Sequence, residues 1–298
     1  MFRAIKRIFI FLGLMAEKAT ENDAINQAVV ERGIRDAKAK ADTAHYANGQ
    51  LAGQIALLKD QIKRQDRQRE DLQGMLQAAA AANFSHRVFY QQFRHRLKPH
   101  TWTLYDGVPT CCKDSRWAPS HVVSKHGALR IRTYKDARYG GQWVSGGVSM
   151  ARMVNQTYGR WVFRFRMKKG VGVGMDVALR PSGSGTVVDW AEQSSDKGGK
   201  RRIETATLHY GGTRVHARVR ANFTRWHTMT LSWKPGRITV KLDGRRWANF
   251  RHNIPSSPMH MVMQTNTGTN GFTGVMPDSS TPRRVALQID YVAVYRYR

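Results

Sequence analysis

Apolar and basic side chains alternate with a period of two through much of the sequence after Asn83. In the segment Arg160–Gly170, for example, Trp161, Phe163 and Phe165 occupy every second position, and three of the four residues that alternate with them are arginines. Successive side chains of a β-strand point to opposite faces, so this pattern predicts strands with one face in a core and the other face polar. The alternation predicts five core side chains: Trp161, Phe163, Phe165, Trp233 and Val240.

Short turn signals separate the alternating runs. The tetrapeptides KPGR (234–237) and LDGR (242–245) lie between such runs, as the turns of β-hairpins do. Many short strands joined by turns predict an all-β sandwich of roughly 200 residues, a size that one domain can reach.

Residues 17–82 have a different composition. Ala, Gln, Lys, Arg and Asp dominate there and no proline interrupts them, so we expect a long helix. Leu51, Ile55, Leu58 and Ile62 follow one another at steps of four, three and four, as in a coiled coil. A single apolar stripe on a long helix cannot be buried by that helix alone. The stripe therefore predicts a homo-oligomer that assembles through residues 17–82.

The first 16 residues combine three basic side chains with a short apolar run. This pattern leaves three interpretations open: a signal peptide, an interfacial helix that contacts a membrane, or a helix that packs in an assembly. We expect three parts in the chain: a helical stalk, oligomerisation or anchoring segment over 1–83, a linker over 84–101, and the sandwich over 102–298.

The chain is strongly basic, with a formal net charge of +28 at pH 7. Residues 1–83 hold 13 basic and 10 acidic side chains, a net +3, so residues 84–298 carry +25. Such a field favours polyanionic partners. We find no helix-turn-helix, zinc-finger or RNA-recognition signature in the sequence, which makes nucleic acid a less favoured partner than an acidic glycan. The adjacent Cys111 and Cys112 match neither a metal site nor an ordinary disulfide, and we expect no cofactor, with a structural calcium ion left open.

Nine segments of the sandwich occur in a distinctive order. They are LYDG (104–107), RWAPSHVVSKHGALRIRT (116–133), VSGGV (144–148), TYGRWVFRFR (157–166), VVDWAE (187–192), TLHYG (207–211), RWHTMTLSWKPGRITVKLDG (225–244), SSPMHMVMQ (256–264) and IDYVAVYR (289–296). This order resembles glycoside hydrolase family 16, the concanavalin-like jelly rolls of laminarinases, lichenases, agarases and carrageenases. The resemblance spans about residues 102–297 and implies a jelly-roll sandwich that recognises polysaccharide.

The catalytic strand of that family has the pattern Glu-x-Asp-x-(x)-Glu, in which alternation and a bulge bring three acids to one face. The first Glu is the nucleophile, the Asp tunes it, and the last Glu is the general acid/base. The resemblance assigns the last two roles to Asp189 and Glu192 but puts Val187 at the nucleophile position. Valine cannot attack an anomeric carbon, so the resemblance implies a catalytically impaired domain.

Hydrolysis by this chain would need another carboxylate beside Glu192, for which Glu204 and Asp176 are candidates. A second departure lies in the YGR segment, where Val162 replaces a family Glu. Val162 shares one strand face with Arg160 and Arg164, and we expect this face to lie on the side of the catalytic acids.

Six residues are candidates for binding polysaccharide. Indole faces stack on sugar rings, polar groups fix sugar hydroxyls, and arginines bind sulfate or phosphate groups. Each of the two tryptophans, the histidine and the glutamine could equally have a structural role. The candidates are Trp190, Trp143, His209, Gln264, Arg160 and Arg164.

These observations predict a carbohydrate-binding protein. A self-associating helical stalk would present an impaired family-16-like domain to a surface polysaccharide, sulfated or phosphorylated. Such an arrangement suits a virion or tail protein, or an extracellular or cell-envelope adhesion protein. Two alternatives stay open: an active endo-acting β-glycoside hydrolase with Glu192 as acid/base, and a structural scaffold of a larger assembly.

Overall fold

The structure is a computed structural model that describes residues 24–79, 84, 86–97, 101–110, 113–193, 199–268 and 274–298. The chain divides into two compact units, Met1–Leu72 and Gln73–Arg298. The predictions for residues 1–16 and for Cys111 and Cys112 fall outside the described residues. In the described part of the chain, no helix has both the length and the apolar character required to span a membrane.

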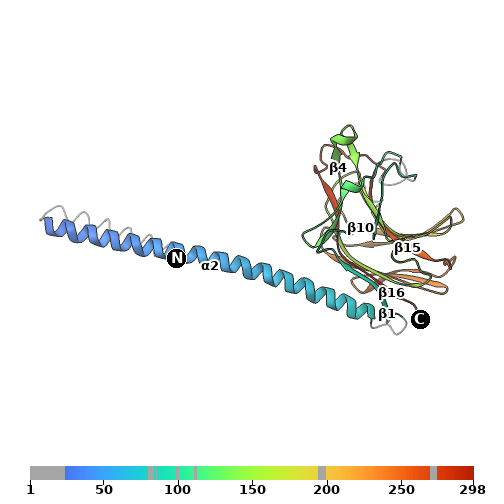
Figure 1. Cartoon of the computed structure of the whole chain (residues 1–298), viewed down its shortest axis with the longest axis horizontal. Helices are drawn as coiled ribbons and strands as arrows, with labels where there is room; N and C mark the ends of the chain where they lie inside the picture. The colour runs from blue at the N-terminus through green and yellow to red at the C-terminus, as the bar shows by residue number, and fades with distance from the viewer. Residues whose placement is uncertain are drawn as a thin grey trace. The chain divides into compact units, whose positions relative to one another are not determined.

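The predicted helix is present as α2 (Ala24–Ala79), a continuous helix of 56 residues (Figure 1). On its predicted stripe, Leu51, Ile55 and Leu58 are 54%, 50% and 55% exposed. Exposure at this level leaves the apolar stripe available to a second helix, and the coiled coil remains a prediction.

The sixteen strands that follow α2 form two sheets, one of nine strands and one of seven. Sheet A has the order β14-β13-β12-β7-β16-β4-β3, with β1 paired to β16 and β5 paired to β4. Its strands are β1 (His86–Gln92), β3 (Val122–Lys125), β4 (Ala128–Asp136), β5 (Gln142–Val144), β7 (Gly159–Met167), β12 (His227–Lys234), β13 (Arg237–Leu242), β14 (Arg245–Phe250) and β16 (Val285–Arg296). Two short 3-10 helices, η2 (Pro119–His121) and η3 (Ala137–Tyr139), flank β3 and β4.

Sheet B has the order β11-β10-β9-β8-β15-β6-β2. Its strands are β2 (Thr103–Leu104), β6 (Gly147–Ser149), β8 (Val173–Pro181), β9 (Val187–Glu192), β10 (Ile203–Tyr210), β11 (Thr213–Arg220) and β15 (Met259–Thr267). The two sheets form a sandwich (Figure 1), which confirms the predicted all-β fold.

The core lies between the two sheets and is built by the alternation seen in the sequence. The five predicted core residues are all fully buried and belong to one apolar cluster: Trp161, Phe163, Phe165, Trp233 and Val240. Each sheet therefore has a second face, turned away from the core, which we call its outer face. Polar side chains of the strands are displayed on these two outer faces.

The range 84–101, expected to be a linker, contributes to the sandwich. Strand β1 pairs along Tyr291–Arg296 of β16, beyond the part of β16 that pairs with β4. Phe93, just after β1, is fully buried in the main core. Pairing with β1 covers backbone groups of β16 that would otherwise form an open sheet edge. Residues 86–93 are therefore part of the folded domain rather than a spacer.

Candidate functional site

The site predicted from the sequence centres on β9, between β8 and β10 in sheet B. In the ladder between β8 and β9, Asp189 lies opposite Ala178 and Ala191 lies opposite Val177, so Trp190 is an extra residue, a β-bulge. Both Trp190 and Ala191 face the core and are fully buried. The bulge therefore returns Glu192 to the outer face of sheet B, on the side that Asp189 occupies.

Asp189 is held by a histidine from the neighbouring strand. His209 Nε2 donates a hydrogen bond of 2.6 Å to Asp189 Oδ2. His209 stands directly opposite Val187 in the ladder between β9 and β10, so its imidazole reaches diagonally to Asp189. The structure thus brings together His209, Asp189 and Val187, three of the positions that the family resemblance singled out.

A second carboxylate on this face belongs to Asp176 of β8. Asp176 lies directly opposite Glu192 on β9 and opposite Gln264 on β15. Gln264 Nε2 donates to Asp176 Oδ2 at 3.3 Å, and a guanidinium nitrogen of Arg180 lies 3.6 Å from the same oxygen. Side chains directly opposite in an antiparallel pair have Cβ atoms about 4.5–5.5 Å apart, so Asp176 and Glu192 are close neighbours.

Glu204, the other candidate for a second carboxylate, is on the opposite side of sheet B. Its side chain is fully buried and accepts a hydrogen bond of 2.6 Å from Gln193 Nε2. Its core-facing neighbours on β10, Ala206 and Leu208, confirm this orientation. Glu204 cannot meet a substrate on the outer face, whereas Asp176 lies on that face but is only 3% exposed.

Strand β11 adds a row of basic residues at the edge of sheet B. Arg214 lies opposite His209, His216 opposite Thr207, and Arg218 opposite Thr205. Directly opposite residues share a face, so these side chains extend the outer face of Asp189 and Glu192. The sequence signal was present in TRVHARVR (213–220), where basic and apolar residues alternate immediately after a Gly-Gly turn.

Two aromatic side chains near Gln264 were not predicted as site residues. Gly147 on β6 lies opposite Gln264, and a side chain at Gly147 would meet the ring of Tyr105 at 2.3 Å. Tyr105 therefore lies over the outer face here, and its ring centroid is 4.7 Å from that of Trp117. Trp117 is fixed by hydrogen bonds from its Nε1 to Asn266 Oδ1 and to a main-chain oxygen of β15. Both of these rings are half-buried.

The assignment of Trp190 to the binding surface is wrong. Its indole is fully buried in the core and meets Phe163 edge-on, with ring centroids 5.0 Å apart. Adjacent residues of a strand point to opposite faces, so Trp190 must face the core when Asp189 faces outward.

The assignment of Arg160 and Arg164 to the side of the catalytic acids is also wrong. Both lie on β7 in sheet A, and their side chains are on the outer face of that sheet, across the core from Asp189. Arg164 forms a 2.6 Å ion pair with Asp290. Val162, between them, packs in a small cluster on the same outer face. The alternation predicted their shared face, but not the sheet to which that face belongs.

Trp143 lies on β5, and it lines two hollows of about 390 Å³ and 710 Å³. Asp114, Gln142 and Met276 share the smaller hollow with it. Among the described residues that line these hollows there is no Asp189, Glu192, His209 or Gln264. Neither hollow is therefore shared with the acids of β9. Nor do the described residues include a group of three or more His, Cys, Asp or Glu side chains placed to hold a metal ion.

Comparison with solved structures identifies proteins of the same fold. The catalytic domain of an endo-1,3-β-glucanase (laminarinase) from Thermotoga petrophila RKU-1 is 17% identical, with a TM-score of 0.64 over 72% of this chain and 99% of that one. The laminarinase from Rhodothermus marinus is 21% identical, with a TM-score of 0.63 over 72% and 98%. A LamA variant from Zobellia galactanivorans, solved with laminaritriose and laminaritetraose, is 16% identical, with a TM-score of 0.62 over 72% and 100%.

Sequence comparison gives the family. No curated protein matches the chain. The sequence pattern of "Glycosyl hydrolases family 16" matches residues 112–292, which is more than half of the chain and includes β9 with Asp189 and Glu192. The chain belongs to glycosyl hydrolase family 16.

Proposed function

We propose that this family-16 domain binds polysaccharide on the outer face of sheet B and that its hydrolytic activity is impaired. The observation that carries the proposal is Val187, two residues before Asp189 on the same face, where the family pattern requires the nucleophilic Glu. An apolar side chain there provides no atom to attack the anomeric carbon and no charge to stabilise the transition state.

The remaining carboxylates are poorly suited to replace the nucleophile. A retaining displacement needs an accessible carboxylate about 5 Å from the acid. Asp176 is near Glu192, but it is almost completely buried and bonded to Gln264. Asp189 is bonded to His209. Both carboxylates are buried and already accept a hydrogen bond at one oxygen, which supports binding over hydrolysis.

An anionic polysaccharide fits the charge of this face better than a neutral one. Arg214, Arg218 and Arg220 of β11 are exposed at the edge of sheet B, and Arg180 of β8 is 39% exposed. Guanidinium groups bind sulfate and phosphate groups through paired hydrogen bonds. Together with a helical stalk that associates with other copies, such a surface suits attachment to a sulfated or phosphorylated glycan by a virion or cell-envelope protein.

The opposed pair Asp176 and Glu192 favours one alternative, an endo-acting β-glycoside hydrolase with a non-standard second carboxylate. The test compares wild type, E192Q, D176N and V187E for release of reducing ends from laminarin and from neutral and sulfated galactans. V187Q is the matched control, since it has the size of the glutamate without its charge.

We expect no product from wild type, binding of a sulfated glycan to wild type in affinity electrophoresis, and product from V187E but not V187Q. Product from wild type that disappears in both E192Q and D176N would overturn the proposal in favour of the hydrolase. Absence of both product and binding would overturn it in favour of a scaffold.

A further inference from the structure

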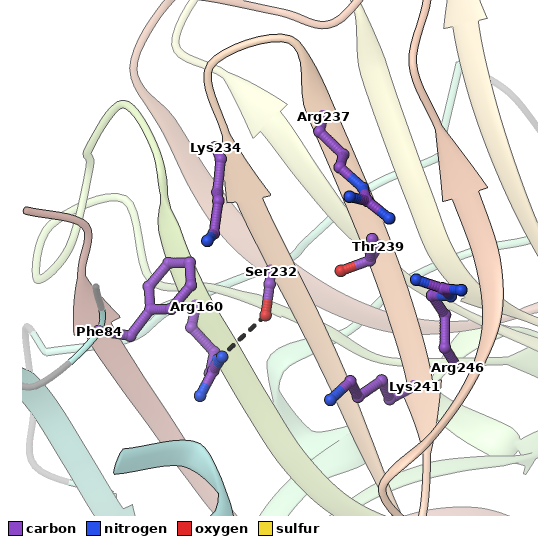
Figure 2. Close-up of a pocket in the computed structure, with 8 residues that line it drawn as sticks. All are labelled: Phe84, Arg160, Ser232, Lys234, Arg237, Thr239, Lys241 and Arg246. Atoms are coloured by element: carbon purple, nitrogen blue, oxygen red, sulfur yellow. Dashed lines mark hydrogen bonds between the residues drawn. The ribbon is translucent and has the colours of Figure 1, made fainter. Parts of the chain in front are cut away.

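Five cationic side chains surround a hollow of about 220 Å³ on the outer face of sheet A (Figure 2). They come from four neighbouring strands, β7, β12, β13 and β14. We call this hollow the outer pocket. Its lining residues are Phe84, Arg160, Ser232, Lys234, Arg237, Thr239, Lys241 and Arg246.

The register of sheet A fixes these side chains on one face. Ser232 on β12 lies directly opposite both Arg160 on β7 and Thr239 on β13. Lys241 on β13 lies opposite Arg246 on β14. Residues opposite one another share a face, while the intervening residues of each strand fill the core. Figure 2 shows the charged ends of the side chains around the hydroxyl groups of Ser232 and Thr239.

Two of the arginines are held in position by hydrogen bonds from Nε. Arg160 Nε donates to Ser232 Oγ at 3.0 Å, and its guanidinium lies 4.3 Å from the centre of the Phe84 ring. Arg237 Nε donates to Asn249 Oδ1 at 2.9 Å. Since a guanidinium has five N–H donors, a bond through Nε leaves the terminal nitrogens of Arg237 able to donate to a ligand.

The electrostatics of the outer pocket favour an anion. Among the described residues that line it there is no carboxylate. Arg160 is only 6% exposed, and burial lowers the pKa of its guanidinium, because desolvation disfavours the charged form. An anion bound among the five cations would offset both this desolvation and their mutual repulsion.

The neighbouring arginines of β7 are engaged differently. Arg164 pairs with Asp290 at 2.6 Å, and Arg166 donates to Gln288 Oε1 at 3.0 Å and 3.1 Å. Both guanidinium groups also lie over the ring of Trp226. A carboxylate and an amide thus accept hydrogen bonds from these two cations, whereas the described lining of the outer pocket provides hydroxyl groups and no carboxylate.

We propose that the outer pocket binds a sulfate or phosphate monoester group of a polysaccharide, at a site separate from the face that carries Asp189. Arginines would donate paired hydrogen bonds to the oxyanion, lysines would supply charge, and Ser232 and Thr239 would donate their hydroxyls. A single hollow suits one ester group and part of its sugar. A single-stranded nucleic acid would need a longer basic groove with several aromatic faces, and Phe84 is the one aromatic side chain among the described lining residues.

The test uses the full chain and a short dextran sulfate oligosaccharide, with unsulfated dextran and single-stranded DNA of equal charge as comparison ligands. The variant K241Q/R246Q removes two cations of the outer pocket. K168Q/K169Q is the matched control, because both of its positions are exposed and lie outside the lining. Hydrogen exchange of β12 and β13, measured on wild type with and without dextran sulfate, locates the site independently of any variant.

We expect K241Q/R246Q to bind dextran sulfate about tenfold more weakly than wild type, since two charge-assisted contacts are lost. The control should change affinity by about twofold or less, as loss of exposed charge alone does. Dextran sulfate should slow exchange of β12 and β13, and unsulfated dextran should not. Equal losses in the two double variants, or no protection of β12 and β13, would overturn the proposal. Tighter binding of DNA with a larger loss in K241Q/R246Q would replace it with a nucleic-acid site.

Discussion

Arg164 and Asp290 form an ion pair whose side chains are only 6% and 11% exposed. Removing one member of a buried pair leaves the other charge without its partner, at a cost of about 3–5 kcal/mol, while replacing both by apolar residues is often neutral. We expect R164M to lower the free energy of unfolding by about 3 kcal/mol and R164M/D290L to recover most of this loss. Urea denaturation of the two variants and wild type measures both effects.

That prediction also tests the corrected position of Arg164. If Arg164 has a structural role on sheet A, R164M should lower stability but leave the affinity of the folded protein for glycan unchanged. If R164M were as stable as wild type but bound sulfated glycan more weakly, Arg164 would return to the binding residues suggested by the sequence.

Family position and strand alternation predict different orientations for two residues of β9, Trp190 and Glu192. Family position placed Trp190 on the binding surface, whereas its adjacency to Asp189 requires it to face the core, where it lies. Alternation alone would place Glu192 in the core as well. It reaches the outer face because of the bulge at Trp190, and a bulge leaves no mark in a hydrophobic pattern. The placement of Glu192 therefore depended on the family resemblance.

Among the secondary-structure elements, α2 has a stripe of exposed apolar side chains. Leu51, Ile55 and Leu58 are each at least half exposed at coiled-coil spacing. We expect the triple variant L51Q/I55Q/L58Q to shift the chain from an oligomer to a monomer in sedimentation velocity, because it removes the apolar contacts between helices. L57Q is the control, since Leu57 is 66% exposed but lies off the stripe. A monomeric wild type, or equal effects of the two variants, would contradict self-association through α2.

A histidine at the start of β12 joins two elements of sheet A. His227 Nδ1 donates to Asp243 Oδ2 at 2.6 Å, and Asp243 Oδ1 accepts from the main-chain nitrogen of Thr228. Burial lowers the pKa of His227, and this is the largest single effect. The hydrogen bond to Asp243, the charge of Asp243 and the hydrogen bond to the main-chain oxygen of Asn222 together outweigh it, and the net shift is upward from 6.5. A raised folded-state pKa contributes stability that is complete below pH 6.5 and is lost as the pH rises through the folded value.

We therefore expect wild type to lose stability relative to H227Q, which lacks the titrating group, as the pH rises above about 6.5. Asp243 is half exposed, so solvent screening should keep the difference to about 1 kcal/mol or less. Urea midpoints at several pH values check the slope. Parallel pH profiles for wild type and H227Q would show that the pair does not contribute to stability.

Hydrophobic periodicity predicts which face of a strand is buried, but not which sheet the strand joins. The alternation predicted the buried faces of β7, β12 and β13, and LDGR predicted the hairpin turn, where Asp243 and Gly244 both have positive φ. Periodicity cannot say to which of two sheets a strand belongs, since that depends on pairings between distant segments. Arg160 and Arg164 were therefore assigned to the wrong side of the sandwich, and β1 was mistaken for a linker because its partner β16 is far away in the sequence.

For the whole molecule, the distribution of the +25 charge of residues 84–298 is more informative than its size. Basic side chains gather at the β11 edge on the outer face of sheet B and in the outer pocket of sheet A. The core separates these two faces, so one short oligosaccharide cannot occupy both sites. A long sulfated polymer, in contrast, could bind one face of one molecule and the other face of the next.

Two separate sites predict a stoichiometry. In titration calorimetry with a short dextran sulfate oligosaccharide, wild type should bind two ligands per chain, and R214Q/R218Q and K241Q/R246Q should each weaken one of the two binding steps about tenfold. The combined variant should weaken both steps, because each pair removes charge from a different face. One ligand per wild-type chain, with affinity reduced in only one of the double variants, would reduce the binding surface to a single face.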